Sequence, residues 1–157
     1  MKDVEDYINN VLDEKRPEFG GKRVCPFAAH ELASGKLLIA ELKNRSLVDF
    51  ILDFKNSTYE SAIVVLAGNI CPKDTKKFQA FTDGLLSYCD MGEYKSICFN
   101  PNDMIPVMGY NPRSLSPGFM VNIAKRSALA KASRSLKKTN YYDKLPKDYL
   151  KFLNIKK

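Results

Sequence analysis

The sequence predicts an α/β fold with a small three-stranded, at least partly parallel sheet flanked by helices. Three short segments predict the strands, at residues 36–42, 61–68 and 95–100. The first two are rich in leucine, isoleucine and valine, as buried strands are. Segments with helical patterns separate the three strands and are long enough for crossover connections. Three strands do not fix the order of a sheet, so a ferredoxin-like α+β arrangement stays open as the alternative.

The helices are predicted from apolar spacing and from the residues that begin them. Residues 3–16 carry apolar side chains at helical spacing. Ser46 and Asp49 resemble a capping box at the start of a helix over 44–57. Further helices are predicted at residues 25–34, 72–90, 116–138 and 140–157, three of them with proline in the first turn.

A single domain spanning residues 1–157 is predicted, with a basic helical segment at 124–157. The length suits one hydrophobic core, and a hydrophobic content of 45% is not that of a disordered chain. No apolar run approaches the roughly 20 residues that cross a bilayer. The N-terminal residues are acidic where a secretory signal would be basic. We therefore expect a cytoplasmic protein without a membrane partner.

The four cysteines are expected to be reduced thiols, because they lie far apart and no Cys-x-x-Cys pair predicts a metal site. Cys25 and Cys71 each precede a proline at a predicted helix start, where the helix dipole favours a thiolate. His30, the only histidine, is turned away from Cys25 by the helical spacing. Cys-Pro pairs also occur where a thiolate binds haem iron, but helix starts explain them equally well. No cofactor or metal is assigned.

Polar loops follow each predicted strand, and the carboxyl ends of parallel strands meet at the edge where α/β proteins bind ligands. These loops are 44–46, 68–71 and 100–103, and residues 109–117 lie next to the third. An arginine among asparagines suits an anionic small molecule, although such residues also cap helices and form turns. The candidate residues are Cys25 and Asp103 as catalytic groups, and Cys71, Asn100, Asn102, Asn111, Arg113 and Ser114 as ligand-binding groups.

Three landmarks resemble an uncharacterised bacterial family, domain of unknown function 1415. They are Cys25-Pro26-Phe27-Ala28, Phe99-Asn100-Pro101 with Asp103, and Asn111-Pro112-Arg113-Ser114 with Ser116-Pro117. The chain departs from the family by inserting Pro112 and by carrying asparagine at position 100 where histidine is expected. The resemblance implies no settled activity, but it directs attention to the same loops.

Charge is distributed unevenly, which leaves a second function open. Residues 124–157 hold eleven lysines and arginines and two aspartates, a net charge of +9. The whole chain carries +7, so the first 123 residues carry −2. A lysine-rich segment is often only a solvated helix face, but it also suits docking on nucleic acid or an acidic partner. The sequence thus favours an enzyme or binding protein for an anionic small molecule, and the alternative is a binding module that uses residues 124–157.

Overall fold

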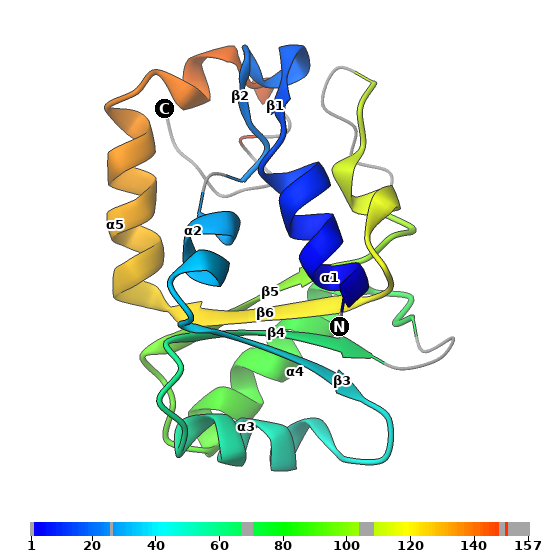
Figure 1. Ribbon diagram of the computed structural model, residues 1–157. Coiled ribbons are helices and arrows are strands. Elements are labelled where there is room, and N and C mark those ends of the chain that lie inside the picture. Colours follow the sequence, from blue (N-terminus) through cyan, green and yellow to red (C-terminus); the bar gives the residue numbers. More distant parts are fainter. Residues whose placement is uncertain (1, 26, 67–70, 104–108, 148–149, 151–157) are drawn as a thin grey trace.

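A four-stranded mixed sheet forms the centre of the protein in a computed structural model (Figure 1). The structure describes residues 2–25, 27–66, 71–103, 109–147 and 150. The strand order is β3-β4-β6-β5. The bounds of the strands are Leu37–Leu42 for β3, Ser61–Leu66 for β4, Tyr94–Phe99 for β5 and Met120–Lys125 for β6.

The prediction of a three-stranded sheet is wrong, because β6 lies inside the segment that was predicted as a helix over 116–138. β6 pairs with β4 on one side and β5 on the other, and Val121 and Ile123 are fully buried. Pairing on both sides and burial on both faces outweigh the local helical pattern. The ferredoxin-like alternative is also wrong, since β3 and β4 are direct parallel neighbours rather than a split pair.

Strand direction decides which loops lie together. β3 and β4 are parallel, while β6 is antiparallel to both β4 and β5. β3, β4 and β5 therefore run the same way, and their carboxyl ends share one edge of the sheet with the first residue of β6. The described residues directly after β5 and directly before β6 lie at this edge.

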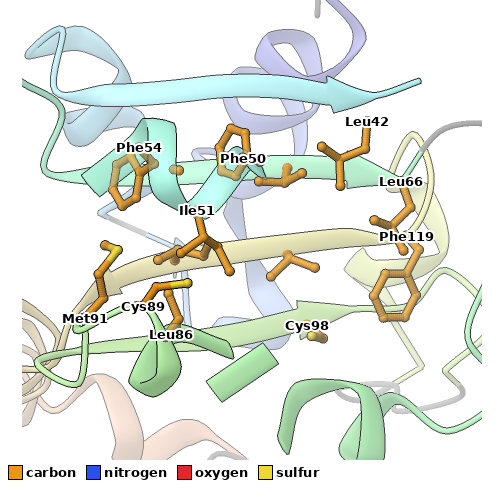
Figure 2. Packing of buried hydrophobic residues seen from close by; sticks show 14 residues of the cluster. Leu42, Phe50, Ile51, Phe54, Leu66, Leu86, Cys89, Met91, Cys98 and Phe119 are labelled. Carbon is orange, nitrogen blue, oxygen red and sulfur yellow. The ribbon is translucent and has the colours of Figure 1, made fainter. Parts of the chain in front are cut away.

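One face of the sheet is covered by α3 (Leu47–Lys55) and α4 (Thr75–Tyr88) (Figure 1). The Ser46 hydroxyl accepts a hydrogen bond from the backbone N–H of Asp49, which confirms the predicted cap. The core on this side contains fully or almost fully buried side chains from both helices and the strands, and Figure 2 labels ten of them. They are Leu42, Phe50, Ile51, Phe54, Leu66, Leu86, Cys89, Met91, Cys98 and Phe119.

The opposite face carries the N-terminal and C-terminal segments (Figure 1). The first predicted helix is shorter than expected, because a π-helical turn and a small antiparallel sheet follow it. The elements from the two ends of the chain are α1 (Lys2–Tyr7), η1 (Ile8–Leu12), β1 (Lys15–Arg16), η2 (Pro17–Phe19), β2 (Lys22–Arg23), α2 (Ala28–Ala33), α5 (Arg126–Lys137) and η4 (Tyr141–Lys144). Residues 148, 149 and 151–157 of the last predicted helix lie outside the described residues.

Candidate functional site

Asn100, directly after β5, forms several hydrogen bonds at this edge of the sheet. It is 3% exposed. Its Nδ2 donates to the carbonyl of Pro72 at 3.2 Å and to Oγ1 of Thr75 at 3.0 Å. Its Oδ1 accepts from the backbone N–H of Asn102 at 2.9 Å and from the thiol of Cys71 at 3.0 Å. Asn100 thus joins the end of β5 to the segment that begins α4.

Asp103 and Arg113 form a largely buried ion pair. Arg113 Nη1 lies 3.0 Å from Asp103 Oδ2 and also donates to the carbonyl of Cys98 at 3.4 Å. The Arg113 guanidinium lies over the ring of Phe99, 5.2 Å from its centroid, and Arg113 is only 6% exposed. The other carboxylate oxygen of Asp103 accepts from the hydroxyl of Thr75 at 3.1 Å. The positive charge of Arg113 is therefore balanced within the protein rather than presented to solvent.

Asn111 ties the 3-10 turn η3 (Pro112–Leu115) to the segment after β5. Its Nδ2 donates to the carbonyl of Asp103 at 2.8 Å, and its Oδ1 caps η3 by accepting from the backbone N–H of Arg113. Ser114 is exposed and donates to the carbonyl of Asn111 at 2.8 Å. The structure thus brings seven of the eight candidate residues to one edge. Six of them form, with Thr75, a polar cluster that consists of Cys71, Thr75, Asn100, Asn102, Asp103, Asn111 and Arg113.

Cys71 is the group of the polar cluster with nucleophilic chemistry. Its thiol is partly buried and donates to Asn100 Oδ1, while Asn102 Nδ2 donates to its sulfur at 3.3 Å. Asn102 is exposed. The sulfur is thus held between two amides, and Cys71 as a residue is partly exposed.

Cys25 does not belong to the polar cluster. Its backbone N–H donates to the carbonyl of Leu12 at 2.8 Å, and its side chain packs against the core on the other face of the sheet. Burial raises the pKa of the Cys25 thiol, and the backbone N–H groups of Ala28 and Phe27 offset this only in part. The direction is opposite to the one expected for a thiol polarised by a helix start. α2 begins at Ala28 and has only six residues, so it supplies little dipole.

Two further differences concern the loops. Thr75 was missed, because it lies within a segment that was predicted as helix from residue 72, whereas Asp74 caps α4 and Thr75 is its first residue. Among the hydrogen bonds of the described residues, none joins the 44–46 loop to the polar cluster. Arg45 instead pairs with Asp53 at 2.7 Å. β3 and β5 lie at opposite ends of the strand order, which accounts for this separation. Of the predicted 68–71 loop, only Cys71 is among the described residues.

Cys98, on β5 beneath the polar cluster, gives a prediction about pH. Burial, followed by the negative charge of Asp83, raises the pKa of the Cys98 thiol to about 12. In the unfolded chain this thiol loses its proton above about pH 8.5, which is the ordinary pKa of cysteine. The raised pKa therefore stabilises the fold below this pH, and the stabilisation is lost as the pH rises toward 12. We expect the free energy of unfolding to fall by up to about 1.4 kcal/mol per pH unit above pH 9.

Urea denaturation at pH 8, 9 and 10 measures this dependence, with Cys98→Ala as the comparison. Tyrosine and lysine ionisation affect both proteins alike, so only the difference between their slopes reports the thiol. The variant is expected to lose stability less steeply. Identical slopes for the two proteins would contradict the assignment.

Comparison with known proteins identified no relative of this chain. Comparison of the chain with models of known protein families, with curated proteins and with solved structures found no match in any of the three. The resemblance to domain of unknown function 1415 therefore stays a prediction. Within the described residues, no group of three histidine, cysteine, aspartate or glutamate side chains is arranged to hold a metal ion. Nor does this part of the chain contain a helix with the length and apolar character needed to cross a membrane.

Proposed function

We propose that the polar cluster is a small-molecule site in which the Cys71 thiol meets the ligand. The observation that carries this proposal is the placement of the Cys71 sulfur, held at 3.0 Å and 3.3 Å by two amides in a residue that is partly exposed. The edge formed by the carboxyl ends of β4 and β5 is also where α/β sheets bind ligands. Whether the ligand is only bound or also reacts with the thiol depends on its own chemistry.

The proposal divides the polar cluster into contacting and positioning residues. Cys71 and Asn102 reach solvent and would touch the ligand. Asn100 fixes the position of the thiol, and Thr75 connects Asn100 to Asp103. The Asp103 carboxylate, predicted as a catalytic group, already accepts from Thr75 and Arg113, so we assign it a positioning role.

An anionic ligand remains the class that the surroundings favour. Arg113 is not the source of the attraction, since its charge is paired with Asp103. Lys73 and Lys76 are exposed and lie within five residues of Cys71 along the chain. Asp74 caps α4 by accepting from the backbone N–H of Lys77, so the attraction would come from the lysines rather than from the helix end. A site of this kind needs Cys71 to stay reduced, and we therefore propose a reducing compartment such as the cytoplasm.

Alkylation with iodoacetamide at pH 7.5, followed by mass spectrometry of the peptides, tests the thiol. Cys71 is expected to react about tenfold faster than Cys25 and Cys98, because burial raises the pKa of both of those thiols. An Asn102→Ala variant is expected to slow labelling of Cys71, because it removes the hydrogen bond to sulfur. Ser114→Ala is the matched control, since Ser114 bonds only a backbone carbonyl. Faster labelling of Cys25 than of Cys71 would contradict the proposal.

The anionic class has its own test. Sodium phosphate is expected to slow alkylation of Cys71 relative to sodium chloride at equal ionic strength, because bound phosphate would cover the thiol. Replacing Lys73 and Lys76 by glutamine is expected to remove the difference between the two salts. Equal rates in both salts for the unaltered protein would exclude phosphate as the anionic group.

A second candidate function concerns α5 and the residue that follows it. Lys131, Arg134 and Lys138 are exposed, and none of them forms an ion pair with a carboxylate of the described residues. We propose that this face docks on a polyanion, either nucleic acid or an acidic partner. It is a different surface from the polar cluster, and it can be tested separately.

A further inference from the structure

We infer that the exposed face of α5 binds the phosphate backbone of double-stranded nucleic acid without sequence preference. The inference rests on the docking role proposed for α5 and specifies the partner. α5 extends along one flank of the molecule, away from the edge of the sheet that carries the polar cluster (Figure 1). None of its twelve residues is buried, which leaves a long side of the helix open to solvent.

The inward side of α5 is already used by the fold. Leu129, Ala132, Ser133 and Leu136 are partly buried, at a spacing of three and four residues. Leu136 packs against the core on this face, and the hydroxyl of Tyr142 donates to Ser133 at 3.4 Å. These contacts fix the rotation of the helix, so its remaining side points to solvent in a defined orientation.

The charged residues of the outward side are all positive. No acidic residue occurs between Ala124 and Tyr142, while six lysines or arginines do. Lys131, Arg134 and Lys138 follow one another at intervals of three and four residues on the same side of the chain. They span about 10 Å at the rise of an α-helix, a length over which one strand of a duplex presents about three phosphates.

The side chains between these cations favour a polyanion over a folded protein. Ser127, Ala130 and Ser135 are small and exposed, so a phosphate strand could lie close to the helix. A protein partner would need a buried patch with aromatic or other large anchors. The outward side of α5 offers none. A duplex needs only positive charge, because release of its condensed counterions drives the binding.

The same arrangement disfavours a membrane surface. Helices that lie in a bilayer interface insert an apolar face between the lipids. The large apolar residues of α5, Leu129 and Leu136, face inward instead, and its outward residues are small or charged. Binding through charge alone, without insertion, is therefore the mode that this helix allows.

The inference is tested by fluorescence anisotropy with a fluorescein-labelled duplex of about 20 base pairs. Three phosphate contacts predict a slope of about −2.7 for log K against log salt. The affinity should then fall about 40-fold between 50 mM and 200 mM salt. Two duplexes of unrelated sequence should bind within about twofold of each other, because phosphate contacts carry no sequence information.

Two triple variants separate the face from the overall charge. Lys131→Gln, Arg134→Gln and Lys138→Gln together are expected to reduce binding at 50 mM salt at least tenfold and to flatten the salt dependence. The control combines Lys2→Gln, Lys43→Gln and Lys77→Gln, which removes the same charge from exposed positions on other parts of the chain. It should bind within about threefold of the unaltered protein. Circular dichroism melting checks that both variants are folded.

The outcomes also separate this inference from the broader docking role. Binding to poly-glutamate or to phosphatidylserine vesicles, but not to the duplex, with loss in the α5 variant, would overturn the inference and leave a docking surface. Binding to none of the three probes at 50 mM salt would overturn both. Equal losses in the two triple variants would show that net charge, rather than α5, is responsible, and would overturn the inference.

Discussion

An Asp103→Ala variant is expected to lose about 3 kcal/mol of unfolding free energy, because it leaves the Arg113 guanidinium buried without its carboxylate. Arg113 is 6% exposed and lies 3.0 Å from Asp103. Removing one partner of a buried ion pair is far more costly than removing one partner of a surface pair, which costs below about 1 kcal/mol. Urea denaturation at pH 7 measures the difference.

Two further variants establish that charge is the cause. Asp103→Asn keeps an oxygen that can accept from Thr75, and so it tests the ionic part of the interaction alone. Adding Arg113→Met to Asp103→Ala removes the uncompensated charge and is expected to recover part of the lost stability. A loss of unfolding free energy below about 0.5 kcal/mol for Asp103→Ala would mean that the pair behaves like a surface pair. That result would contradict the positioning role of Asp103.

The grouping of the candidate loops could be predicted from the sequence because it depends on strand direction alone. Cys71 follows β4, Asn100 to Asp103 follow β5, and both strands run the same way. Polar residues after parallel strands meet at one edge whatever the exact strand order. The error in the number of strands therefore did not separate these loops. That error affected only the 44–46 loop, which was predicted to lie closer to the other loops than it does.

Other features depend on contacts that are distant in the chain. β6 was missed because Ser116-Pro117 is a typical helix start, while its strand conformation comes from pairing with β4 and β5. The thiol of Cys25 was predicted to be reactive from the residues next to it in the sequence. Burial against the core decides its pKa instead, in the opposite direction. The pairing of Arg113 with Asp103 could not be predicted either, since both residues suited a ligand equally well.

An Asn100→Ala variant is expected to lose about 3 kcal/mol of stability and to label faster at Cys71. Truncation leaves the carbonyl of Pro72, the hydroxyl of Thr75 and the backbone N–H of Asn102 without their present partner. Each buried polar group left unpaired costs roughly 1–3 kcal/mol, and exposed Asn102 can turn to water. The thiol of Cys71 also loses its acceptor, so alkylation should accelerate about tenfold, the equivalent of a hydrogen bond of about 1.4 kcal/mol.

An Asn100→Asp variant separates the chemistry of the thiol from general loosening of the structure. Aspartate keeps an acceptor for the S–H group but adds a negative charge beside Cys71, which disfavours the thiolate and should slow alkylation. It also lacks the N–H group that reaches Pro72 and Thr75, so both variants are destabilised. The buried thiols of Cys89 and Cys98 report opening of the whole fold in the same experiment. If both variants accelerated Cys71 together with these two thiols, unfolding alone would explain the labelling, and Asn100 would have no role in setting the reactivity of the thiol.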